Sequence, residues 1–365
     1  METRIGIIGT GVGIRTHLAG FRKTAGATVV GISGSSPDRA RHFAQQHDIP
    51  KAYPDYAALC TDPDLDLICV ASPNSHHFQH VAAATAAGKH VLAEKPLAMS
   101  MAEISQLQAS TRRSDRLHVI NHQLRFNPYI AQIKNLISEG SIGRIYLIQI
   151  HQQSAAFTDP TLPWSWSFEA SQGGGVRLAM ASHLIDLLYF WFPQMKPYHV
   201  LCHLDPVLKM KIDNFGVEHS VDVCSSFNIQ LSTDIVQSIS LSASAAAYGP
   251  SAFRIAIYGN LGEVQFDLTN KLRFSNQDNR GELNDVEVDG VQPGERENKV
   301  SIFSGSFTYF APKLIRAIQN DEELLGAATF SDGADNQRLL EAALTSAQRG
   351  ETVPLNKGYH SLAIF

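Results

Sequence analysis

The sequence predicts an α/β fold in two domains, and three observations support this prediction. The chain begins with a strand, a glycine-rich turn, a helix and a second strand, which is the start of a βαβ unit. Its second half holds runs in which apolar and polar residues alternate, as in an antiparallel sheet with one face left open. At 365 residues, the chain is also longer than one compact core usually needs.

The first element is a short apolar strand over residues 5–8, followed by a turn with glycines at Gly9, Gly11 and Gly13 and a helix expected over 17–21. Glycine tolerates positive φ and lets the backbone approach a pyrophosphate held at a helix N-terminus. The pattern therefore indicates a dinucleotide site, with a tight surface turn as the alternative. Ile14 stands where the usual pattern has a third glycine or alanine.

The second strand is expected at 27–33 and the next helix at 37–46, opening with proline. NAD-specific sites carry an acidic side chain at the end of this strand, where it binds the ribose hydroxyls. Here Ser33, Gly34 and Ser35 offer no carboxylate, and Arg39 follows. Small hydroxyls and an arginine suit a 2′-phosphate, so the sequence favours NADP(H) over NAD(H). A plain exposed helix residue is the alternative for Arg39.

A further buried strand is expected at 65–71, and a helix over 77–87 that Gly88 caps. His76 and His80 lie four residues apart, which is a ligand spacing, but no third ligand accompanies them. We therefore interpret them as helix-end histidines and expect no metal.

The next strand, over 90–98, contains the tripeptide Glu94-Lys95-Pro96. A lysine at the carboxyl end of a strand in a doubly wound sheet lies in the crevice where ligands bind. Pro96 fixes the turn and is a candidate for a cis peptide bond that would aim the lysine. A surface lysine at a strand-to-helix corner is the alternative.

The second half of the chain predicts half-buried strands. Residues 221–231 and 235–244 alternate, and the second run places four serines on one face. The remaining expected elements are strands at 144–151, 254–258 and 264–268, and helices at 311–320 and 333–349. A surface excursion with a short strand at most is expected over 275–299. The open face of such a sheet needs solvent or a partner subunit.

Composition narrows the class of protein. The net charge of -5 gives no polyanion-binding face, so nucleic acid is excluded as a partner. The most apolar stretch, 184–192, is short and carries Asp186, so no membrane span is expected. The N-terminus lacks the shape of a signal peptide. The cysteines are Cys60, Cys69, Cys202 and Cys224, without a paired motif. We expect reduced thiols in a cytoplasmic protein, with the last three buried.

Several motifs together resemble the Gfo/Idh/MocA dehydrogenases, named for glucose-fructose oxidoreductase and inositol dehydrogenase. They begin with the glycine turn, Ser72-Pro73-Asn74 with His77, and the 88–92 run that leads into Glu94-Lys95-Pro96. They continue through Arg125-Phe126-Asn127-Pro128, the glycines 173–175, His183-Leu184-Ile185-Asp186, residues 257–262 and Phe330-Ser331-Asp332-Gly333. The resemblance thus covers nearly the whole chain.

The resemblance implies an N-terminal Rossmann domain with a doubly wound parallel sheet over 1–122, followed by an α/β domain over 123–365. The second domain would carry a large, mostly antiparallel open sheet that contributes to the substrate site and joins copies as a homodimer or homotetramer. The last helices would pack back toward the first domain. The implied activity is hydride transfer between NAD(P) and a sugar, polyol or cyclitol.

The implied roles fall on named residues. Lys95 lies beside the nicotinamide and the substrate oxygen, and His183 is the acid/base. The predicted cofactor-binding residues are Gly9, Gly11, Val12, Gly13, Ile14, Ser33, Gly34, Ser35, Arg39, Ala71, Ser72, Pro73, Asn74, His77, Glu94 and Lys95. The predicted substrate-binding residues are Arg125, Trp164, Trp166 and Asp186. Aromatic core packing, an ion pair across domains and a buried structural histidine are the alternatives for the tryptophans, Arg125 and His183.

One departure from the family pattern bears on catalysis. Members usually carry an aspartate four residues before the histidine, and this chain has Ala179 there. His183 thereby loses a charge partner and the substrate a polar contact, unless Glu169 or Asp222 supplies them. The alternative to an active dehydrogenase is thus a catalytically silent NAD(P)-binding sensor or partner protein. A transhydrogenase with a retained nucleotide is a third reading.

Overall fold

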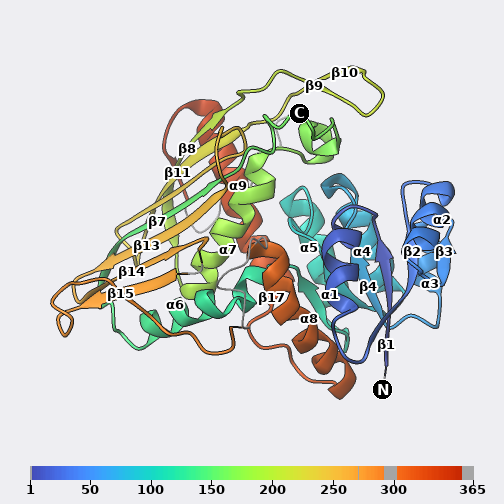
Figure 1. Ribbon diagram of the computed structural model, residues 1–365, viewed down its shortest axis with the longest axis horizontal. Coiled ribbons are helices and arrows are strands. Elements are labelled where there is room, and N and C mark those ends of the chain that lie inside the picture. The colour runs from blue at the N-terminus through green and yellow to red at the C-terminus, as the bar shows by residue number, and fades with distance from the viewer. Residues whose placement is uncertain (1, 270, 292–301, 356–365) are drawn as a thin grey trace. The chain divides into compact units, whose positions relative to one another are not determined.

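The structure is a computed structural model that describes residues 2–269, 271–291 and 302–355 (Figure 1). It forms two compact units, each considered by itself. Unit 1 takes the chain up to Asn127 and the later segment that ends at Asp335. Unit 2 starts at Pro128 and takes up the chain again at Asn336. No helix among the described residues is long and apolar enough to cross a bilayer.

Unit 1 is built on sheet A, with strands in the order β17-β6-β5-β4-β1-β2-β3. All neighbours run parallel except β17, which is antiparallel to β6. The strands are β1 Thr3–Ile8, β2 Ala27–Ser33, β3 Lys51–Tyr53, β4 Leu67–Val70, β5 His90–Ala93, β6 His118–Ile120 and β17 Ala328–Thr329. The strand order reverses beside β1, so the loops after β1 and β4 flank the point where doubly wound sheets bind ligands. This order confirms the predicted doubly wound sheet.

The helices of unit 1 are the π-helix η1 Gly13–Leu18, α1 Ala19–Phe21, α2 Pro37–Gln46, α3 Tyr56–Thr61, the 3-10 helix η2 Asn74–His76, α4 His77–Ala86, α5 Met101–Thr111, the 3-10 helix η3 Gln123–Phe126 and α8 Ile302–Asn320. In Figure 1, α2 and α3 lie against β2 and β3. The α2 helix begins as expected, with Pro37 in its first turn and the Ser36 side chain accepting the Arg39 N–H at 3.2 Å.

Two helices of unit 1 begin earlier than the sequence predicted. The helix after the glycine turn starts at Gly13 rather than residue 17, because the glycines themselves enter a wide π turn. The α8 helix starts at Ile302 rather than residue 311 and passes through Pro312. A proline normally ends a helix, but here Phe307 and Phe310 are fully buried in the core of unit 1, and their packing stabilises the preceding turns.

Unit 2 is built on sheet B, with strands in the order β16-β15-β14-β13-β7-β12-β11-β8-β18. Its pairs are antiparallel except β7 with β12, which confirms the mostly antiparallel sheet. The strands are β7 Ile145–Gln153, β8 Pro197–Asp205, β11 Ser226–Thr233, β12 Ser238–Ser244, β13 Ala252–Gly259, β14 Gly262–Asp267, β15 Lys271–Asn276, β16 Asn284–Asp285 and β18 Val353–Pro354. A separate hairpin holds β9 Met210–Ile212 and β10 Glu218–Ser220.

The helices of unit 2 are α6 Pro128–Ser138, the 3-10 turns η4 Trp166–Phe168 and η5 Ala170–Gln172, the π-helix η6 Arg177–Ala181, and α7 Ser182–Trp191, together with α9 Phe330–Arg349 from Asn336 onward. Figure 1 shows α6, α7 and α9 on one side of sheet B. Along β12, Ile239, Leu241 and Ala243 are buried and the serines between them are half-buried. The predicted period of two is therefore confirmed, and one face of the sheet is open.

Two details of the second half were predicted wrongly. The strand expected from residue 221 begins only at Ser226, because the backbone before it pairs with loops: Val221 N–H donates to Lys209 O, and Cys224 O accepts from Val176. The excursion at 275–299, by contrast, agrees with the expectation: it holds the end of β15 and the short β16, and its part from 292 lies outside the described residues. Cys224 is half-buried rather than buried.

Candidate active site and family

In the glycine turn after β1, Gly9 and Gly13 lie close against neighbouring atoms, whereas Gly11 faces open space. Gly9 has φ +116°, and a Cβ there would lie 2.2 Å from the carbonyl oxygen of Ala71 in the loop after β4. A Cβ at Gly13 would lie 2.7 Å from the Ile7 side chain, whereas one at Gly11 would meet nothing within 4 Å. Gly9 and Gly13 therefore serve the fold, and the space at Gly11 fits a pyrophosphate that approaches the backbone.

Arg39 reaches from α2 toward the glycine turn. Its Nε donates to the hydroxyl of Thr10 at 2.8 Å, and its guanidinium lies 5.0 Å from the centre of the Phe43 ring. Ser33, Gly34 and Ser35 end β2 without a carboxylate, and Asp38 of the same helix pairs with Arg41. The end of β2 thus presents a cation and small hydroxyls beside the turn, which suits a phosphate group.

The loop after β4 is tied to the turn after β5 by a buried histidine. His77 is fully buried, and its ring nitrogens lie 2.9 Å from Ser72 O and 2.7 Å from Pro96 O. Burial lowers the pKa of His77, although the two carbonyls act in the opposite direction. Because both nitrogens face the backbone, His77 contributes to the crevice by fixing the Ala71–Asn74 loop against the Lys95–Pro96 turn.

The turn after β5 presents Lys95, and the Lys95–Pro96 peptide bond is cis, as the sequence suggested. The carboxylate of Glu94 accepts three hydrogen bonds. His17 Nε2 donates to it at 2.8 Å, Asn121 Nδ2 at 2.7 Å and the Lys95 backbone N–H at 3.3 Å. Glu94 therefore fixes the backbone from which the lysine side chain extends.

The Glu94 cluster is almost free of solvent, since His17 and Asn121 are fully buried. Burial raises the pKa of Glu94, but the hydrogen bond and charge of His17, with Lys95 and Asn121, lower it to about 2. Burial also lowers the pKa of Lys95, and Glu94 opposes this. The Glu94 carboxylate thus favours the ammonium form of Lys95 against the effect of burial.

Sequence reasoning missed His17 and Asn121. His17 stands in η1 and its ring stacks on Phe307 at 4.9 Å, and Asn121 directly follows β6. A polar residue placed directly after a parallel strand was the available signal for Asn121.

His183 and Asp186 lie in α7 of unit 2, and both are buried. The preceding residue, Ser182, is held from two sides: its hydroxyl donates to Leu178 O at 2.8 Å, and its carbonyl accepts from Asn336 Nδ2 at 2.7 Å. Ala179 lies in η6 and is exposed. Because Lys95 belongs to unit 1 and His183 to unit 2, their convergence stays a prediction.

Both carboxylates that the sequence offered as substitutes for the missing aspartate have local partners. Asp222 accepts the Ala170 N–H at 2.7 Å, and Glu169 accepts the Ser171 hydroxyl at 2.7 Å. These contacts fix the η4–η5 segment in front of the glycines 173–175.

Of the two tryptophans predicted to bind the substrate, Trp164 is half-buried and Trp166 is exposed. Trp164 stacks on His219 with ring centroids 4.4 Å apart, and its backbone N–H donates to Ile212 O at 2.7 Å. Its Nε1 is buried without an acceptor among the described residues. Trp166 is 36% exposed. An exposed indole face and an indole N–H with no acceptor both suit a hydroxylated ring.

Arg125 forms an ion pair inside unit 1, with its Nη2 3.0 Å from the Asp332 carboxylate. Burial raises the pKa of Asp332, but Arg125 and the hydrogen bonds from Thr329 lower it overall.

Within the described ranges, no group of three or more His, Cys, Asp or Glu side chains is placed to hold a metal ion. His80 Nδ1 instead lies 2.9 Å from the Ser72 hydroxyl.

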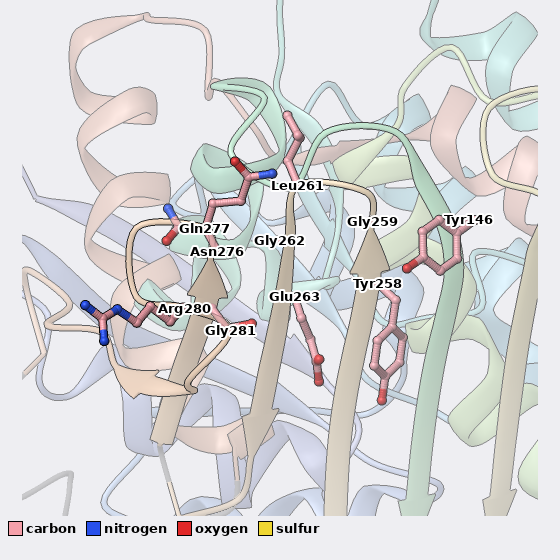
Figure 2. Close-up of a pocket in the computed structure, with 11 residues that line it drawn as sticks. Tyr146, Tyr258, Gly259, Leu261, Gly262, Glu263, Asn276, Gln277, Arg280 and Gly281 are labelled. Atoms are coloured by element: carbon pink, nitrogen blue, oxygen red, sulfur yellow. The ribbon is translucent and has the colours of Figure 1, made fainter.

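A hollow of about 520 Å³ opens at one end of sheet B, apart from every predicted site residue. Figure 2 shows the side chains of Tyr258 and Glu263, which are partners on β13 and β14, projecting from the same face, with Tyr146 and Arg280 at the rim. Its polar lining belongs to the open face of the sheet.

Comparisons with known proteins agree with this geometry. The model of an oxidoreductase family with an NAD-binding Rossmann fold, GFO_IDH_MocA, matches residues 3–122, and the model of its C-terminal alpha/beta domain matches 134–355. A trans-1,2-dihydrobenzene-1,2-diol dehydrogenase from Xenopus laevis is 33% identical over 47% of this chain and 51% of its own. A 1,5-anhydro-D-fructose reductase from Ensifer adhaerens is 32% identical over 51% of this chain and 56% of its own.

The matched stretch spans about half the length of these curated relatives. Among solved structures, a levoglucosan dehydrogenase in complex with NADH and levoglucosan is similar over 98% of this chain and 100% of its own, with a TM-score of 0.87 and 22% identity. The two family models together cover most of the chain and include the glycine turn, Lys95 and His183. The chain belongs to the Gfo/Idh/MocA oxidoreductase family.

Proposed function

We propose that this protein is an oxidoreductase that transfers a hydride between NADP(H) and a secondary alcohol or ketone of a sugar, polyol or cyclitol. The observation that carries the proposal is the set of buried contacts that fixes the turn presenting Lys95. Lys95 follows β5, and a buried carboxylate and a buried histidine fix the turn that presents it. A lysine at the surface needs no such buried support. A fixed backbone suits a side chain that must reach a defined point in a site.

Hydride transfer needs a group that exchanges the hydroxyl proton and a positive charge near the substrate oxygen. The nicotinamide, when bound, supplies or accepts the hydride. In the proposal, His183 exchanges the hydroxyl proton and the Lys95 ammonium stabilises the developing negative charge on the oxygen. Trp164 and Trp166 contact the ring of the substrate, and Asp186 and Arg125 orient groups around it.

The first domain, residues 1–122, holds the cofactor in this proposal, and residues 123–365 supply the substrate site and join copies of the chain. The polar open face of sheet B, with its row of serines along β12, supports a homodimer or homotetramer formed through that sheet.

Preference for NADP(H) rests on Arg39 and gives a direct prediction. Arg39→Gln removes the cation beside Thr10, so the Kd for NADP(H) is expected to rise at least about tenfold while that for NAD(H) changes less than about twofold. Fluorescence titration with both reduced nucleotides measures the effect. Arg41→Gln, on the same helix and paired with Asp38, is the matched control. Equal losses for both nucleotides, or the same loss in the control, would contradict the preference.

The activity itself is tested with a panel of sugars, polyols and cyclitols, following absorbance at the nicotinamide band with NADP+ and with NAD+. We expect turnover with at least one member. Tight nucleotide binding without hydride exchange across the panel would reject the dehydrogenase and support the silent binding protein that Ala179 suggested.

A further inference from the structure

A second hollow, of about 600 Å³, lies within unit 1 at the edge of sheet A where strands begin. Residues at the starts of β1, β4 and β5 line it, together with Arg116 before β6 and the end of α8. The glycine turn, by contrast, follows the carboxyl end of β1. The two sites therefore occupy opposite ends of the same parallel strands, and the dinucleotide proposal leaves this hollow unexplained.

The protonation of His90 is fixed by one backbone contact. His90 is 6% exposed, and its Nδ1 accepts the N–H of Leu117 at 3.0 Å. A backbone amide only donates, so Nδ1 carries no proton. Burial, with Arg116 and His118, lowers the pKa of His90 to about 4, against Asp66 and Asp321, so the ring is neutral at pH 7. The remaining proton must then sit on Nε2, which makes that atom a donor.

Arg116 faces this donor with a second one. Its Nη1 lies 3.4 Å from His90 Nε2, while its Nε donates to Gly88 O at 3.1 Å. Arginine has no acceptor atom, so the two groups cannot hydrogen-bond to each other. The Nε2–H of the buried His90 and a guanidinium N–H of the exposed Arg116 therefore converge without an acceptor among the described residues, and a shared oxygen atom would satisfy both.

Lys89 also lines the hollow. Its side chain is buried and its ammonium donates to Asp62 O and Leu65 O, each at 2.6 Å, which uses two of its three hydrogens. Two carboxylates in the lining oppose the positive charges of Lys89 and Arg116. Asp66 and Glu2 also line the hollow, and Asp66 Oδ2 accepts the Arg4 N–H at 2.8 Å.

The end of α8 and the residues after α3 and α4 also border this hollow, so helix carbonyl ends add negative potential. Two carboxylates and these helix ends disfavour a dianion, whereas a planar, singly charged acceptor matches the donors at His90 and Arg116. We propose that this hollow is a binding site for a small monocarboxylate, whose oxygens accept hydrogen bonds from His90 Nε2 and Arg116.

The test compares melting temperatures of the full chain at pH 7 in sodium acetate, sodium chloride and sodium phosphate of equal ionic strength. Acetate at a saturating concentration is expected to raise the melting temperature by roughly 2–4 °C above chloride. His90→Asn keeps an acceptor for the Leu117 N–H but removes the Nε2 donor, and Arg116→Gln removes the guanidinium. Both variants should lose the difference specific to acetate.

Arg113→Gln is the matched control, because Arg113 is an exposed arginine three residues away that does not line the hollow. It should respond to acetate as the wild type does. A general salt effect would be equal in all four proteins and would overturn the proposal, as would a phosphate effect equal to that of acetate.

A second measurement does not depend on the variants. Nitrogen-15 NMR of the histidine rings should show His90 as the Nε2–H form at pH 7, with an Nε2–H resonance that shifts on addition of acetate. A ring protonated on Nδ1, or a resonance that acetate leaves unmoved, would reject the site.

Discussion

Lys95→Met is expected to lower kcat/KM by about 10³-fold or more with any substrate that the protein turns over. Methionine preserves most of the length of the side chain and removes only the ammonium group. The loss should appear mainly in kcat, because the charge on the substrate oxygen develops in the transition state. Steady-state kinetics at the nicotinamide band measures both constants.

The turn that carries Lys95 should survive this change, because Glu94 also binds the backbone N–H of residue 95, which methionine keeps. Circular dichroism and the melting temperature are expected to match the wild type. Lys23→Met, at an exposed lysine of the same unit, is the control for loss of a charge. Retention of wild-type turnover in Lys95→Met would remove the residue from the reaction and with it the central argument of the proposed function.

Glu94→Gln is expected to destabilise unit 1 by about 3 kcal/mol at pH 7. In the folded protein the pKa of Glu94 lies at about 2, below its usual value of 4.5, so the folded state favours the ionised form. This stabilisation is fully present above pH 4.5 and is lost as the pH falls through about 2. Glutamine keeps the shape of the side chain but not the charge that His17 and Asn121 contact.

Urea unfolding at pH 7, 4 and 2.5 measures this prediction, since the free energy difference between wild type and Glu94→Gln should shrink as the pH falls. Glu323→Gln, at an exposed position of unit 1, should show little difference at any of these pH values. A constant difference from pH 7 to 2.5 would contradict the prediction, because the loss would then not follow the ionisation of Glu94.

Local patterns predicted elements of both units where the relevant signals are short. The glycine turn, the Pro37 helix start and the serine row of β12 each follow from a few neighbouring residues. Arg39 was also identified, because it stands close in sequence to the end of β2. The helix start at Ile302 was missed because the buried aromatic residues that stabilise it pack against distant strands.

The contacts that fix Lys95 could not be read from the sequence. His17, Glu94 and Asn121 are separated by 77 and 27 positions along the chain, and only the order of strands in sheet A brings them together. A histidine in a glycine-rich turn and an asparagine after a strand carry little signal on their own. The same applies to His90 and Arg116, whose relation depends on where β5 and β6 begin.

The outermost strands of sheet B limit how that sheet can associate. In the described part of the chain its borders are the two-residue strands Asn284–Asp285 and Val353–Pro354, and Pro354 lacks an N–H to donate. Such short edge strands give an incoming strand few backbone groups to pair with, which protects against aggregation by edge-to-edge strand pairing. Any stable contact of this sheet with another molecule is therefore expected through the side chains on its face, rather than through an added strand at its edge.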